Sequence, residues 1–176
     1  MKKLCTVLVS TSLLSSAAVV FADNHEEEAN VASAVEIFTC TYNEGMGPKD
    51  LDAASAKFNK WADKRGIDSY SAWTMTPFYS GPNQDFDVMW LGGSAKAAEL
   101  GRVQGAYLSS GTDVQAAFDK AMTCSTHSAV SSLAIKAPPS PVAPPNGVVT
   151  FSDCNIEGGS TFDDLYMPLI EWGKYK

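Results

Sequence analysis

The stretch YSAWTMTPFYSGPNQDFDVMWLGG, residues 70–93, predicts a β-hairpin. Its two arms, residues 70–79 and 86–91, are rich in aromatic and other apolar residues, and the Gly-Pro-Asn at 81–83 between them is a turn signal. Strand alternation puts Phe86, Val88 and Trp90 on one face of the second arm. Asp87 shares the opposite face with a methionine and a leucine. The hairpin therefore predicts a sheet with bulky apolar groups on both faces.

The segments on either side of the hairpin complete a β-α-β-β-α-β order. A strand is expected before it, followed by a helix with an apolar face at helical spacing. After it come an Ala-rich helix, a short second helical segment and a last strand. The expected ranges are 35–42, 50–65, 95–108, 112–122 and 125–135.

This order is that of a split βαβ unit, so the fold class is α+β with a ferredoxin-like antiparallel sheet over residues 35–136. The strand order is then fourth, first, third, second, with the helices on one face of the sheet. The other face carries Trp, Phe and Met side chains and has no helix to cover it. We therefore expect self-association through that sheet face, as a homodimer or a pseudo-dimer.

The first 22 residues have the pattern of a bacterial secretory signal peptide. Lys2 and Lys3 precede an apolar stretch, and Val20 and Ala22 form a small-residue cleavage site. Residues 23–34 form an acidic segment expected to be disordered. The protein is therefore predicted to be periplasmic or secreted, with no membrane association after cleavage.

A Pro-rich linker is expected at residues 137–147, and a partial second repeat, one strand and one helix, at residues 148–176. At an offset of 113, several residues of the first strand and loop recur. They include Val35 as Val148, Phe38 as Phe151 and Glu44 as Glu157. The pattern is that of a truncated tandem.

Together, the βαββαβ unit, the second start after a linker and the Asp85–Gly93 strand resemble the dimeric α/β-barrel superfamily. This group includes antibiotic-biosynthesis-monooxygenase-like and NIPSNAP-like proteins. The resemblance implies two ferredoxin-like units packed sheet to sheet, in one chain or in two. It also implies a site between sheet and helices, in a group whose enzymes include cofactor-free oxygenases, haem-handling proteins and isomerases. The resemblance is one of topology, and it transfers no catalytic motif to this chain.

Two residues are candidates for catalysis. His127, expected in the last strand, could act as a general base because histidine titrates near neutral pH. Asp87 could do so if its carboxylate pointed into a cavity. The alternatives are a polar histidine on a half-exposed strand and an aspartate that serves the hairpin.

Aromatic residues of the expected strands are candidates for ligand binding. The same rings would equally suit a subunit interface. The residues are Trp73, Tyr79, Trp90 and Tyr42.

The cysteines predict one disulfide. In the expected strand order the first and last strands are antiparallel neighbours, which brings Cys40 near Cys124. Cys154 is then a free thiol or pairs between chains.

Composition narrows the function classes. The net charge is −7 and no Lys/Arg run exists, which argues against nucleic-acid binding. No zinc-binding spacing, P-loop or dinucleotide fingerprint is present, so we predict no cofactor and no metal. Two functions remain: a protein that binds a small apolar or aromatic molecule or serves as a non-catalytic module, and a cofactor-independent enzyme of monooxygenase or isomerase type.

Overall fold

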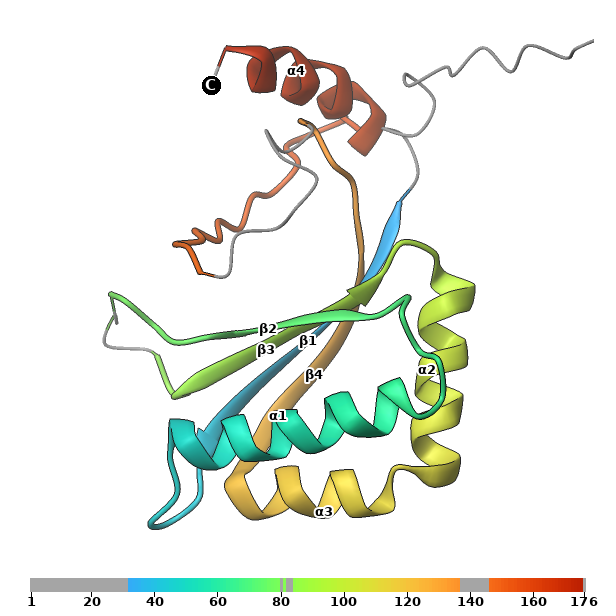
Figure 1. Cartoon of the computed structure of the whole chain (residues 1–176). Coiled ribbons are helices and arrows are strands. Elements are labelled where there is room, and N and C mark those ends of the chain that lie inside the picture. The colour runs from blue at the N-terminus through green and yellow to red at the C-terminus, as the bar shows by residue number, and fades with distance from the viewer. Residues whose placement is uncertain (1–31, 80, 82–83, 137–145, 176) are drawn as a thin grey trace, which may run out of the picture.

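The structure, a computed structural model, describes residues 32–79, 81, 84–136 and 146–175 (Figure 1). The predicted signal peptide at 1–22, the acidic segment up to residue 31 and linker residues 137–145 lie outside these described residues. Expectations about those segments therefore stay predictions.

The described chain contains a four-stranded antiparallel sheet with strand order β2-β3-β1-β4. This confirms the ferredoxin-like order expected from the sequence. Helices α1, α2 and α3 lie on one side of the sheet (Figure 1). The elements are β1 (Ser33–Tyr42), α1 (Pro48–Asp63), β2 (Ser71–Met75), β3 (Val88–Ser94), α2 (Ala97–Ser110), α3 (Thr112–Ala121), β4 (Met122–Ser132) and α4 (Phe162–Lys174).

The element boundaries shift slightly from those expected. β1 begins at Ser33, inside the segment expected to be disordered, because its first residues pair with the end of β4. β4 begins at Met122, directly after α3, because Met122 already has the extended backbone of a strand. α1 begins with Pro48, and the Asp50 carboxylate accepts a hydrogen bond from the Gly47 amide at 3.0 Å.

Register assigns side chains to the two faces of the sheet. Phe38 of β1 pairs with Trp90 of β3 and His127 of β4. Directly paired residues of antiparallel strands share a face, and these three face the helices. Their neighbours Ile37 and Leu91 therefore face the other way. The apolar residues of this second face, called here the open face, are Val35, Ile37, Trp73, Met75, Met89, Leu91 and Val130, and they share the face with the polar residues Thr39, Thr126 and Ser128.

A β-bulge interrupts the β1–β4 ladder. Thr39 pairs with Thr126, whereas Cys40 pairs with Cys124, so Ser125 is an extra residue on β4. In a regular strand residues 124 and 127 would point to opposite faces. The bulge instead brings both Cys124 and His127 to the helix side.

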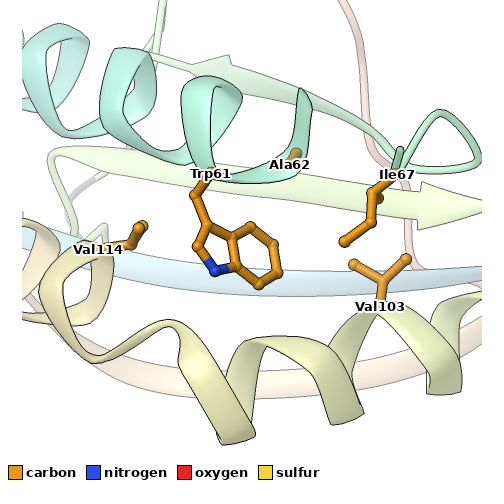
Figure 2. Packing of buried hydrophobic residues seen from close by; sticks show 5 residues of the cluster. All are labelled: Trp61, Ala62, Ile67, Val103 and Val114. Atoms are coloured by element: carbon orange, nitrogen blue, oxygen red, sulfur yellow. The ribbon is translucent and has the colours of Figure 1, made fainter. Parts of the chain in front are cut away.

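Apolar side chains fill the layer between helices and sheet in two clusters. The helical cluster consists of Trp61, Ala62, Ile67, Val103 and Val114 (Figure 2). The sheet cluster consists of Cys40, Leu51, Val88 and Met122. Phe118 of α3 packs against both clusters, which places it between them.

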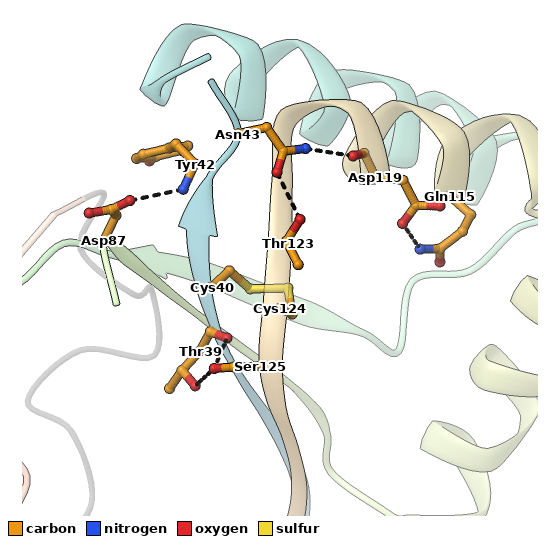
Figure 3. The surroundings of a disulfide bond; sticks show 10 residues. All are labelled: Thr39, Cys40, Tyr42, Asn43, Asp87, Gln115, Asp119, Thr123, Cys124 and Ser125. Atoms are coloured by element: carbon orange, nitrogen blue, oxygen red, sulfur yellow. Dashed lines mark hydrogen bonds between the residues drawn. A yellow bond between two sulfur atoms is a disulfide. The ribbon is translucent and has the colours of Figure 1, made fainter. Parts of the chain in front are cut away.

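A disulfide joins Cys40 of β1 to Cys124 of β4 (Figure 3). The two Cα atoms are 3.9 Å apart, and the bond closes a loop of 84 residues. Cys154 is a free and exposed thiol. The disulfide expected from the strand order is therefore present.

The C-terminal part matches the expected partial repeat only in its helix. α4 forms over Phe162–Lys174, but residues 146–161 form no strand. The strand expected after residue 148 was therefore wrong for this chain. A strand needs a neighbouring strand for its backbone N–H and C=O groups, and among the described residues neither edge strand, β2 or β4, pairs with this segment.

Removing the disulfide should lower stability strongly. In the chain-entropy model a loop of this length contributes about 4.5 kcal/mol. We expect the double variant Cys40→Ala/Cys124→Ala to lose up to that amount of unfolding free energy in urea denaturation. Cys154→Ala is the matched control and should leave the urea midpoint unchanged. Equal midpoints for the double variant and the parent protein would contradict the prediction.

Candidate functional site

A cavity of about 410 Å³ lies between the sheet and the helices. Its wall is mostly apolar and aromatic, with a few polar side chains. Leu108 and Gln115 line it and are both exposed, so the cavity opens to solvent beside α2 and α3. The other lining residues are Glu36, Phe38, Phe58, Tyr70, Trp90, Val103, Gln104, Tyr107, Phe118, Met122, Cys124 and His127.

The polar part of the wall is built around the buried carboxylate of Glu36, on the central strand. Its Oε1 accepts a hydrogen bond from the Tyr70 hydroxyl at 2.7 Å. Its Oε2 accepts one from Gln104 Nε2 at 2.8 Å. The Tyr70 oxygen in turn accepts the indole N–H of Trp90 at 2.9 Å. This chain of bonds satisfies buried polar atoms that would otherwise be costly.

Gly92 of β3 makes room for this network. A Cβ at position 92 would collide with the Tyr70 hydroxyl group. The glycine therefore lets Tyr70 reach across the sheet surface to Glu36.

His127 lies on the far side of the same carboxylate. Its Nε2 is 3.4 Å from Glu36 Oε2, and its ring stacks on Phe38 with centroids 3.9 Å apart. The imidazole is about half exposed, with 52% of its side chain accessible, whereas only 9% of the Glu36 side chain is. A carboxylate in this position can orient the imidazole ring through a hydrogen bond to Nε2.

Two tyrosine hydroxyls of the wall are held in their neutral form. Burial, and then the charge of Glu36, raises the pKa of Tyr70 far above its usual value. Burial, followed by the charges of Asp119 and Glu36, raises the pKa of Tyr107 to about 12. Both groups therefore act as hydrogen-bond donors, Tyr70 to Glu36 and Tyr107 to Gln115 Oε1 at 2.9 Å.

Of the predicted catalytic and ligand-binding residues, the structure brings two into the cavity wall, His127 and Trp90. Trp73 lies on the open face and is 43% exposed, and Tyr79 lies in the β2–β3 loop. Tyr42 ends β1 and packs beside the sheet cluster. These three residues do not line the cavity.

Asp87 is also outside the cavity, which corrects the expectation of a cavity base. Its Oδ2 accepts a hydrogen bond from the Tyr42 amide at 2.9 Å (Figure 3). Its own amide donates to the Cys40 carbonyl at 2.9 Å. Asp87 therefore fastens the start of β3 to the end of β1, and its exposed carboxylate has no access to the cavity.

Sequence reasoning missed Glu36, Tyr70 and Gln104. One signal was available for Glu36, because alternation along the first strand places it on the same face as Phe38 and Cys40. A carboxylate on an otherwise apolar face is unusual and indicates a polar contact. Tyr70 reaches Glu36 from the residue before β2, and Gln104 reaches it from α2. Both contacts join segments that are far apart in the sequence, so no local pattern predicts them.

Among the residues that the structure describes, no group of three or more His, Cys, Asp or Glu side chains is placed to hold a metal ion. Within the same residues, no helix has both the length and the apolar character needed to cross a membrane.

No family model and no curated protein matches the sequence. Solved structures with a related arrangement include that of a candidate chlorite dismutase, with 13% identity and a TM-score of 0.37. The match covers 57% of this chain and 42% of that one, so this chain corresponds to less than half of that protein.

Two smaller proteins match over most of their length. A hypothetical Arabidopsis thaliana protein has 4% identity and a TM-score of 0.41, over 62% of this chain and 94% of that one. A dimeric ferredoxin-like protein of unknown function from Thermobifida fusca has 10% identity and a TM-score of 0.36, over 58% and 92%. The assignment of this chain to the ferredoxin-like fold rests on its own strand order and connectivity.

Tyr70→Phe should destabilise the protein by about 1–3 kcal/mol. The change leaves the indole N–H of Trp90 without its acceptor and the Glu36 carboxylate without one donor, both in a largely buried setting. Thermal and urea unfolding measure the loss. Tyr79→Phe removes the hydroxyl of an exposed tyrosine and should leave stability unchanged. Identical unfolding curves for the two variants would show that the network is not held in solution.

Proposed function

We propose that the protein binds a small, largely apolar, ring-containing molecule in the cavity between sheet and helices. The observation that carries the proposal is the cavity itself, whose aromatic wall meets a compact polar group at Glu36 and His127. Ligand sites of proteins typically combine an apolar wall with a few placed polar groups. A volume of about 410 Å³ is within the range of such sites.

A second candidate function is a cofactor-independent enzyme, of monooxygenase or isomerase type, acting in the same cavity. The close approach of Glu36 and His127 favours it, because a carboxylate that orients an imidazole supports general-base chemistry. The imidazole of His127 would accept a proton from the substrate. Asp87 takes no part in this candidate, since it lies outside the cavity.

We also propose that two copies associate through the open face. Trp73 and Val130 there are 43% and 45% exposed, beside the half-buried Ile37, Met89 and Leu91. Covering such an apolar face would release its hydration water and stabilise a dimer.

The Cys40–Cys124 disulfide supports the export proposed from residues 1–22, since structural disulfides persist in oxidising compartments.

The cavity proposal predicts binding of a neutral aromatic probe. N-phenyl-1-naphthylamine should fluoresce more strongly on titration with the protein and saturate at one probe per chain. Leu108→Asp places a charge at the cavity mouth and should weaken binding about threefold to tenfold, since an apolar contact is replaced. Ser109→Asp, one residue further on α2 and outside the wall, is the matched control. No saturable binding to the parent protein would reject the cavity as a ligand site.

The open-face proposal predicts a dimer by light scattering after size exclusion. Trp73→Lys should shift the mass to that of a monomer, because a buried ammonium without a partner is costly. Tyr79→Lys, an exposed change in the β2–β3 loop, should leave the dimer intact. A monomeric parent protein would refute association through this face.

A further inference from the structure

The charge of the cavity wall is unbalanced. Glu36 is buried, with 7% of its surface accessible, and its two short hydrogen bonds come from Tyr70 and Gln104. Both donors are neutral groups. The described residues that line the cavity include no lysine and no arginine. The wall therefore holds a carboxylate with no permanent positive charge beside it.

A carboxylate away from water is costly unless a positive charge or several hydrogen bonds compensate it. His127 is the nearest candidate, but its Nε2 is 3.4 Å away and its ring is half exposed. Its charge is also present only when the imidazole is protonated. A cation inside the cavity would compensate Glu36 more completely.

The hydrogen bonds of Glu36 leave room for such a cation. Each oxygen of a carboxylate can accept two hydrogen bonds. Among the described residues, Oε1 accepts only the bond from Tyr70, so one acceptor position remains. An N–H of a ligand ammonium group fits that position, whereas a ligand carboxylate would be repelled.

The rest of the wall suits the body of the same ligand. Five aromatic rings besides those of His127 and Tyr70 line the cavity, and aromatic side chains attract cations through their negative faces as well as packing against apolar rings. These residues are Phe38, Phe58, Trp90, Tyr107 and Phe118.

We propose that the ligand of this cavity is a protonated amine on an apolar ring system, an arylalkylamine in chemical terms, with its ammonium group bound to Glu36. This deepens the proposed function and rests on it. The ammonium group donates to Glu36 Oε1, and the ring system lies among the aromatic side chains.

Three probes of the same shape test the proposal at neutral pH: 2-naphthylmethylamine, 2-naphthalenemethanol and 2-naphthoic acid. They are a cation, a neutral molecule and an anion. Displacement of N-phenyl-1-naphthylamine and titration calorimetry give their dissociation constants. We expect the amine to bind at least about tenfold more tightly than the alcohol, because it gains a charged hydrogen bond. The acid should bind most weakly.

Two variants test whether the preference for the amine over the alcohol depends on Glu36. Glu36→Gln should remove the advantage of the amine over the alcohol, and Glu44→Gln, at an exposed loop position, should retain it. Should Glu36→Gln fail to fold, the ranking of the three probes on the parent protein still decides the proposal. His127→Gln changes the other polar group of this part of the wall, and the amine should keep its advantage over the alcohol because that advantage belongs to Glu36.

The experiments distinguish failure of the amine proposal from failure of the cavity as a ligand site. Similar binding of the alcohol and the amine would overturn the amine assignment and leave the ligand site standing. Tightest binding of the acid would overturn it in favour of a site built on a protonated imidazole. Loss of amine binding in His127→Gln would overturn it in favour of a neutral imidazole that accepts the ammonium N–H. Failure of all three probes and of N-phenyl-1-naphthylamine would reject both the site and the amine.

Discussion

The pairing of β1 with β3 on one side and with β4 on the other determines which side chains of the sheet face the helices. In the centre of β1 every residue pairs with one residue of β3 and one of β4. The alternation of side chains along β1 therefore fixes which side chains of β3 and β4 face the helices. Trp90 and His127 face the helices because they pair with Phe38. Leu91 lies on the open face because it pairs with Ile37. A slip of one residue would exchange the two faces. The cavity, the disulfide and the apolar open face all depend on this register.

The feature of that arrangement with the largest desolvation penalty is the carboxylate of Glu36, which is buried on β1. Glu36 is held from three directions, by Tyr70 before β2, by Gln104 on α2 and by His127 on β4. These contacts tie one helix, two strands and the residue before β2 together in a layer otherwise packed by apolar side chains. Purely apolar residues would stabilise such a core at lower cost. The buried charge beside the cavity is the group that the proposed ligand would contact.

Much of the fold could be predicted from local patterns. The helical spacing around Trp61, the hairpin turn and the order of elements are local signals, and the strand order then brings Cys40 to Cys124. The site was less predictable because it depends on contacts between distant segments. The extra residue Ser125 changes the side on which His127 lies, and no period-two pattern shows a bulge. Asp87 has the sequence context of a buried strand residue, yet it lies directly before β3 and hydrogen-bonds to the backbone of β1. The C-terminal similarity predicted a strand, but similarity of sequence does not supply backbone pairing, and residues 146–161 pair with neither edge strand of the sheet.

The first residue of β1 and the last residue of β4 are paired, and this affects how the domain can be connected to other segments or domains. Ser33, where β1 begins, lies opposite Ser132, where β4 ends. The chain thus enters and leaves the domain at neighbouring points, and the Cys40–Cys124 bond clamps the same two strands further along. A unit with adjacent entry and exit points is well suited to insertion into a loop of a larger protein, or to circular permutation with new termini in the β2–β3 loop. A tether attached at Ser33 and one attached at Ser132 would therefore hold the cavity at nearly the same place.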